Sequence, residues 1–240
     1  MIFNLPGTYE LNKRLNKETF VTHLQGKDVE RFKSAVKKIT LISQLAGEDI
    51  PSVVNENYNV QVIMFLQVEL ETIKDGTFVA NAMQMAIKTP AFIELFDENK
   101  NAKCSFALKR LNQADNTQVV ITHNILSEEY SLRFDSEFKD NFYKFVDYPK
   151  ILNAKDKVTF AQEIFTKLYI LSNPKLFVGI VDLLESKVWY NENKVSVLLD
   201  NLVQLNNLKK QVDSETDMVS AIALKQKIKT KIAEIKKGVN

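Results

Sequence analysis

Residues 59–71, with the sequence NVQVIMFLQVELE, show the most regular alternation of apolar side chains in the chain. Side chains of a β-strand point to opposite faces in turn, so apolar residues at every second position predict a strand with a buried face. The other face begins apolar and ends with polar side chains, among them Glu69 and Glu71. We therefore expect the central strand of a sheet, buried on both faces at its start and on one face at its end.

The segments that follow predict an α+β fold. Residues 77–88 have the spacing of a helix, which Pro90 closes because the residue before a proline avoids the helical conformation. Further strands are predicted at 91–96, 102–111, 117–124 and 130–134. This order of one strand, one helix and then several strands indicates a mixed or antiparallel sheet of four to five strands with helices on one face.

Helical spacing also occurs on both sides of this region. Residues 1–16, with Pro6 and Gly7, predict an extended segment. Apolar residues at intervals of three and four predict one helix over residues 27–46, ended by Gly47, and further helices over 156–171 and 174–187. We expect an α+β domain over residues 1–134 and a helical subdomain, packed on it, over residues 135–193.

Residues 194–240 predict a helical, coiled-coil-like extension. An apolar stripe with alternating spacings of four and three residues runs to Val219 and then resumes in another phase at Ile228. Either one long helix with a stutter or two helices folded back as a hairpin would explain the change of phase. We favour the hairpin because a single chain can then bury both stripes. The residues of the first stripe are Leu198, Leu202, Leu205, Val212 and Val219.

Composition excludes several classes of protein. The chain has a net charge of +2 and one cysteine, Cys104, so it cannot form an internal disulfide and fits a reducing compartment. No apolar run approaches the length of about 20 residues that spans a bilayer. The first residues lack the basic and apolar regions of a secretory signal. We therefore expect a cytoplasmic protein without contact to a membrane.

Several segments resemble one family when they are taken in order. They are FNLPGT and LNKRLNKETF at 3–8 and 11–20, the segment 39–50, TPAFIEL at 89–95 with FALKR at 106–110, and 205–232. Together they resemble the bacterial family described as domain of unknown function 4391. Residues 15–16 depart from the Ile-Pro usual in the family, and residues 130–134 lack its tryptophan. The resemblance implies no specific activity, but the family's genes often lie beside DNA methyltransferases and helicases of restriction-like defence loci.

Carboxylates on neighbouring strands are the main candidates for chemistry. Glu69, Glu71 and Glu94 could hold a divalent cation, as in many nucleases, and Lys109 could complete such a site. The expected nuclease pattern has Glu-x-Lys on one strand, whereas Leu95 and Phe96 follow Glu94. A solvated polar face of the sheet explains the same residues. Two histidines without metal-like spacing and one cysteine cannot form a structural zinc site, so we expect no metal and no cofactor.

The end of the chain is its most basic part. Residues 224–240 hold six lysines against one acid, Glu234. Such a helix could contact nucleic-acid phosphates, although an ordinary solvated face is the simpler explanation of the same residues. The apolar stripe beside it could bind a partner helix or pack within the chain. The candidate nucleic-acid-binding residues are Lys225, Lys227, Lys229, Lys231 and Lys236.

These observations lead to three hypotheses for the function. The first is a non-enzymatic accessory subunit of a bacterial DNA-targeting defence or restriction complex, which docks a helicase or DNA methyltransferase, or forms a homodimer, through its C-terminal helices. The heptad stripe, the lack of catalytic motifs and the gene context of the family favour it. The second is a metal-dependent nuclease with the carboxylate site. The third is a DNA- or RNA-binding module that uses the basic helix.

Overall fold

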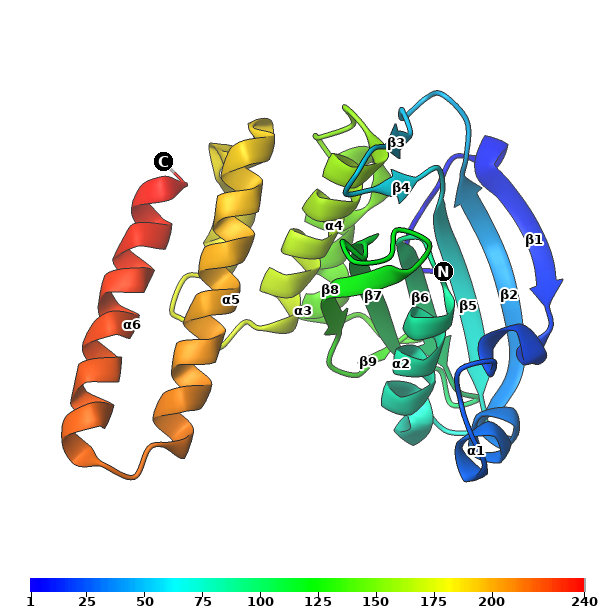
Figure 1. Cartoon of the computed structure of the whole chain (residues 1–240), viewed down its shortest axis with the longest axis horizontal. Coiled ribbons are helices and arrows are strands. Elements are labelled where there is room, and N and C mark those ends of the chain that lie inside the picture. The colour runs from blue at the N-terminus through cyan, green and yellow to red at the C-terminus, as the bar shows by residue number, and fades with distance from the viewer. Residues whose placement is uncertain (240) are drawn as a thin grey trace.

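The computed structural model describes residues 1–239, which form one large sheet, a two-stranded ribbon and helices on both faces of the large sheet (Figure 1). The strands are β1 Glu10–Leu15, β2 Val36–Leu45, β3 Val53–Val54, β4 Asn59–Val60, β5 Ile63–Leu70, β6 Ala91–Phe96, β7 Asn101–Leu111, β8 Val119–Leu126 and β9 Tyr130–Ser131. The α-helices are α1 Lys27–Ala35, α2 Gly76–Ala86, α3 Glu137–Asn141, α4 Lys157–Ser172, α5 Glu192–Ser214 and α6 Met218–Gly238. Short 3-10 and π-helical turns complete the connections.

The large sheet has the strand order β1-β2-β5-β6-β7-β8, and β9 pairs with β7 as its seventh strand. Strands β5 and β6 are parallel, and the other neighbours are antiparallel. The α+β class with a mixed sheet is therefore confirmed, although the sheet has more strands than the four to five expected. The predicted central strand is divided, because β4 pairs with β3 in a separate ribbon before β5 enters the sheet.

The additional strand β2 corrects the helix predicted over residues 27–46. Helix α1 ends at Ala35, and β2 follows directly. From Ile39 to Leu45 the side chains are buried at every second position, a period that the helical spacing of the earlier residues concealed. The strand pairs with β1 on one side and with β5 on the other. These hydrogen bonds satisfy the backbone groups on both sides of β2, which explains why a strand replaces the second half of the helix.

Two hydrophobic cores lie on opposite faces of the sheet. On one face, Phe65 and Phe92 pack with α4 and with the N-terminal residues Ile2 and Phe3. On the other face, Leu66 and neighbouring residues pack with α1 and α2. The expectation of helices on one face is therefore wrong. A strand that is covered on both faces loses the simple alternation, which explains the continuous apolar run at the start of β5.

The helix predicted over residues 174–187 is also wrong. Gly179 has a φ of +85°, a left-handed conformation that interrupts a helix, and 3-10 helices at Val181–Glu185 and Lys187–Tyr190 follow it. These turns bury Leu183, Leu184 and Trp189 against the core that contains α4. A compact connection therefore leads from α4 to α5.

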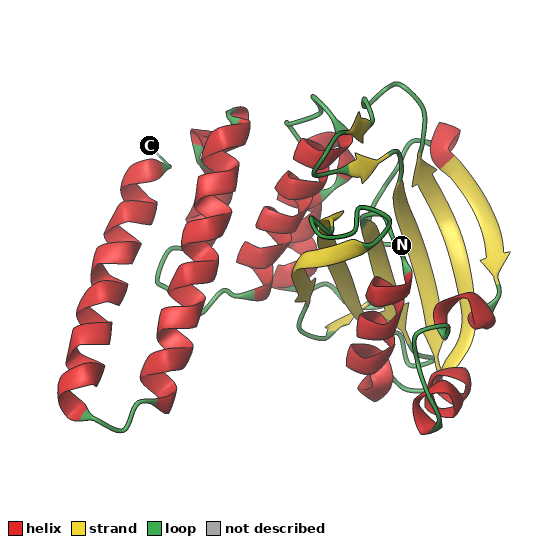
Figure 2. Ribbon diagram, in the orientation of Figure 1, coloured by secondary structure: helices red, strands yellow, loops and turns green. Residues whose placement is uncertain are grey.

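The C-terminal residues form two helices rather than one long helix. Helix α5 ends at Ser214, and α6 starts after Asp217, whose side chain accepts a hydrogen bond of 2.7 Å from the backbone N–H of Ser220. Figure 1 shows α6 at the outer edge of the molecule, with α5 between it and α4. Figure 2 shows these long helices on one side of the molecule and the strands on the other. Within residues 1–239, no helix combines the length and apolar character needed to cross a membrane.

Candidate functional site

Glu94, the most deeply placed candidate carboxylate, is saturated by contacts within the protein. Its side chain is fully buried and accepts hydrogen bonds from the backbone N–H of Ile2 at 2.8 Å and from Gln67 Nε2 at 2.6 Å. The hydroxyl of Tyr130 donates to it at 3.3 Å, and the N-terminal amine lies 3.6 Å away. Each oxygen of Glu94 is therefore engaged in holding the N-terminal segment against the sheet, and neither oxygen faces solvent.

The other candidates of the carboxylate site lie elsewhere. Glu71 is exposed at the end of β5 and forms an ion pair with Lys37, with 3.2 Å between Oε2 and Nζ. Glu69 pairs in the strand register with Phe96 rather than with Glu94. Glu94 pairs in the strand register with Cys104 on β7, and Lys109 is an odd number of residues from Cys104 on the same strand. Lys109 therefore projects from the face of the sheet opposite to that of Glu94. The described residues 1–239 contain no group of three metal-binding side chains, so this arrangement gives a metal-dependent nuclease no support.

Lys109, the remaining candidate of this site, is buried next to the end of α2. It is 4% exposed, and its Nζ donates to the backbone carbonyls of Ile87 at 2.5 Å and Thr89 at 3.1 Å, just after α2. Burial lowers the pKa of Lys109 to about 7. The side chain lines a pocket of about 290 Å³ together with His23 and Gln84. Sequence reasoning proposed Lys109 but missed Gln84, a buried polar residue in α2. The position of Gln84 among the inward-facing apolar residues of α2 was the signal in the sequence that could have identified it.

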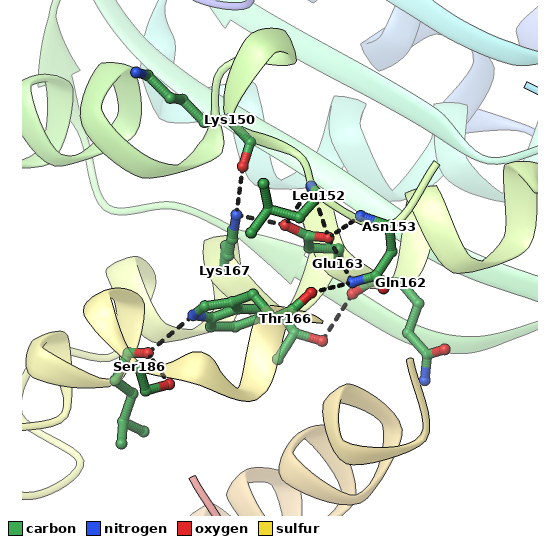
Figure 3. Close-up of polar contacts among 10 residues, drawn as sticks. Lys150, Leu152, Asn153, Gln162, Glu163, Thr166, Lys167 and Ser186 are labelled. Carbon is green, nitrogen blue, oxygen red and sulfur yellow. Dashed lines mark hydrogen bonds and ion pairs between the residues drawn. The ribbon is translucent and has the colours of Figure 1, made fainter. Parts of the chain in front are cut away.

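A second buried charge cluster fixes α4 to the loop before it (Figure 3). Glu163 accepts hydrogen bonds from the backbone N–H groups of Leu152 and Asn153, at 3.0 and 2.7 Å, and pairs with Lys167 at 2.5 Å. Lys167 Nζ also donates to the carbonyl of Lys150 at 2.8 Å. Desolvation lowers the pKa of Lys167, which the neighbouring Glu163 opposes. Glu163 and Lys167 are 0% and 3% exposed, so this pair has a structural role.

The apolar stripe proposed for partner binding is divided by the fold. Leu198, Leu202 and Leu205 are at most 3% exposed and belong to the core that contains α4. They cannot contact a partner while they pack in this core. Val212 is half-buried, and Val219, which the turn carries onto α6, is 75% exposed. The sequence could not separate these roles, because both halves of the stripe have the same spacing.

The start of α6, next to the turn from α5, carries an exposed apolar cluster. Met218, Val219 and Ile222 are 77%, 75% and 59% exposed. Residues three and four apart lie on one side of a helix, so Ile222 neighbours both of the others. We call these three residues the hairpin tip. The rest of α6 packs on α5 through residues that include Ile232 and the buried Ile235.

The five candidate lysines of α6 divide into two groups. Lys231 forms an ion pair of 2.7 Å with Glu234 and donates to Asn201 of α5, and Lys236 lies over the ring of Phe177 at 5.8 Å. These two lysines are engaged within the chain. The other three are exposed, and none of them has an ion pair among residues 1–239; they are Lys225, Lys227 and Lys229. They do not form a single line, since residues two apart lie on nearly opposite sides of a helix.

Comparison with known proteins assigns the chain to a family. No curated protein and no solved structure matches it. A family model described as Domain of unknown function (DUF4391) matches residues 3–235, which is nearly the whole chain of 240 residues. The resemblance predicted from short segments of the sequence is thereby confirmed. The chain belongs to the DUF4391 family.

Proposed function

We propose that this protein is a non-enzymatic accessory subunit whose α5–α6 hairpin docks a protein partner. The partner class that we expect is a helicase or DNA methyltransferase of a bacterial DNA-targeting defence or restriction complex. One observation carries the proposal: the hairpin tip exposes Met218, Val219 and Ile222 at the outer edge of the molecule. The gene neighbourhoods of the family motivate the choice of partner.

The composition of the hairpin supports docking to a protein. Single exposed apolar residues are common, but three that share one helix end form a patch that water solvates poorly. Lys225 and Lys229 follow this patch along α6 and are exposed. Interfaces commonly combine an apolar centre with a polar rim of complementary charge. The complementary surface is therefore an apolar groove bordered by acidic residues.

The test is co-purification of the full chain with the products of neighbouring genes. The variant replaces Met218, Val219 and Ile222 with serine. Since these side chains are largely exposed and α6 retains Ile228, Ile232 and Ile235, we expect an unchanged fold by circular dichroism but loss of the partner. The control is Val54→Ser in β3, which removes an apolar side chain of similar exposure, 67%, from the sheet region.

Two results would overturn the docking proposal. Equal recovery of the partner with the triple variant and with Val54→Ser would show that the hairpin tip is not used. Light scattering provides the second result. If the wild-type chain is a dimer, the triple variant a monomer, and neither binds a helicase or methyltransferase, the tip serves self-association instead.

A second candidate function is binding of nucleic acid, which the exposed lysines Lys225, Lys227 and Lys229 favour. Each lysine that neutralises a phosphate releases counterions, so the affinity should fall steeply with salt, with a slope of about −0.7 to −0.9 per contact in a double-logarithmic plot. Replacing the three lysines with glutamine should flatten this slope. The matched control replaces Lys13, Lys38 and Lys74, which are exposed on β1, on β2 and in the turn before α2. An affinity of the wild-type chain that does not change with salt would exclude this function.

A further inference from the structure

The pocket beside Lys109 has the features of a binding site for a small molecule. It measures about 290 Å³ and lies between the loop before α1, the end of α2 and the start of β8. Its polar lining includes His23, Gln84 and Lys109, and Lys88 and Thr117 also contribute. Neither Asp nor Glu lines it. The pocket therefore offers positive charge and hydrogen-bonding groups without an opposing carboxylate.

Gln84 presents an unpartnered acceptor here. Its Nε2 donates to the backbone carbonyl of Ala91 at 3.0 Å and contacts Ser105 Oγ at 3.2 Å. A carbonyl oxygen can only accept, so Ala91 determines which end of the amide carries the nitrogen. The opposite atom, Gln84 Oε1, is buried and has no hydrogen-bond partner. A buried acceptor without a partner is costly, and a ligand with an O–H or N–H group would satisfy it.

His23 adds a second unsatisfied group. Both of its ring nitrogens are buried, and neither has a hydrogen-bond partner among the described residues. Each ring nitrogen can form one hydrogen bond. A ligand with hydrogen-bonding groups in the pocket would therefore satisfy them.

Lys109 supplies the charge. Its ammonium has three N–H groups, of which the carbonyls of Ile87 and Thr89 occupy two. No carboxylate forms an ion pair with it in the described part of the chain, so its protonated form lacks a counterion. An anion in the pocket would supply this counterion, and phosphate oxygens are strong acceptors for such a cation.

We propose that the pocket formed by His23, Gln84 and Lys109 binds a small phosphate compound that carries at least one hydroxyl group. Inorganic phosphate and the phosphate ester of a small hydroxylated molecule share this chemistry. The phosphate oxygens accept from Lys109, and the hydroxyl donates to Gln84 Oε1. His23 contacts the same ligand through either nitrogen. This binding site lies beside α2, β7 and β8 and shares no residue with the hairpin tip.

The experiment compares inorganic phosphate with sulfate by titration calorimetry of the full chain at neutral pH. Both ions are tetrahedral, but sulfate has no proton to donate to Gln84. We expect phosphate to bind at least about tenfold more tightly than sulfate, the scale set by one unpaired buried group. Glycerol phosphate is the third probe. Tighter binding of glycerol phosphate than of inorganic phosphate would identify an ester as the ligand class, and the reverse would identify the free ion.

Variants locate the binding site. Lys109→Met should weaken phosphate binding at least about tenfold. Lys103→Met, on the same face of β7 but outside the pocket, is the matched control. If circular dichroism shows that Lys109→Met does not fold, His23→Phe in the loop takes its place. The proposal is overturned if phosphate does not bind at millimolar concentration, if sulfate binds equally well, or if Lys103→Met weakens binding as much as the pocket variant.

Discussion

The buried pair of Glu163 and Lys167 leads to a sharp prediction about stability. Glu163→Ala removes the acceptor for the backbone N–H groups of Leu152 and Asn153 and leaves the Lys167 ammonium, 3% exposed, without its counterion. Removing one partner of a buried ion pair costs about 3–5 kcal/mol. For a chain of this length, each kcal/mol corresponds to roughly 2–4 °C in the melting temperature. We therefore expect a decrease of about 10 °C.

The exposed pair of Lys144 and Glu185 is the matched control. Its Nζ–Oε1 distance of 2.6 Å is nearly the same as the 2.5 Å between Lys167 and Glu163, but its side chains are 60% and 62% exposed. Exposed ion pairs contribute about 0–1 kcal/mol, because water and salt screen the charges. Glu185→Ala should therefore change the free energy of unfolding by less than about 1 kcal/mol.

Urea unfolding monitored by fluorescence provides the assay. Trp189 is the single tryptophan, and its ring lies 5.1 Å from Lys167 Nζ, so the signal reports on this region. A double variant, Glu163→Met with Lys167→Met, separates charge from packing. It should be more stable than Glu163→Ala, because it leaves no unpaired charge. Equal losses of stability for Glu163→Ala and Glu185→Ala would refute the reasoning that burial determines the contribution of the pair.

Two further predictions concern titratable groups. Burial lowers the pKa of Lys109 from 10.5 to about 7, so between these values the unfolded chain binds more protons than the folded chain. The free energy of unfolding of the wild-type protein, relative to that of Lys109→Met, should therefore rise with pH by up to about 1.4 kcal/mol per pH unit. Urea titrations of both chains across this pH range provide the measurement. A difference in free energy that stays constant with pH would contradict the prediction. Burial raises the pKa of Cys104 from 9.0 to about 12, and the thiol is 2% exposed. A thiol reagent should react about a thousandfold more slowly with the native than with the unfolded chain at pH 8, and similar rates would contradict this.

Some elements could be predicted because their signals are local. The period of two in β7 and the helical spacing of α2 and α4 follow from how successive side chains point in each type of element. Residues 36–45 show the limit of such signals. Val36 and Ile39 fit the helical spacing as well as the strand, and pairing with β1 and β5 decided between the two. These partners are distant in sequence, so no local pattern contains this information.

The candidate residues show the same limit. Glu69, Glu94 and Lys109 were correctly expected as polar side chains on strands, but the sequence could not show that Glu94 and Lys109 lie on opposite faces. One of the bonds that saturate Glu94 comes from Ile2, which is 92 residues away. The pocket likewise joins His23, Gln84 and Lys109 from three separate segments. Nothing in the spacing of these residues indicates that they share a pocket.

By itself, the sequence determined the α+β class, the centre of the sheet and the family, because periodic patterns and short ordered segments are properties of neighbouring residues. The tertiary structure decided what the C-terminal stripe does. Leu198 and Leu202 pack in the core of the chain, whereas Val219 is exposed at the hairpin tip. Their heptad spacing is the same, but the turn before α6 reverses the chain and directs them to different surroundings. Burial depends on which distant elements come together, and that arrangement exists only in the folded protein.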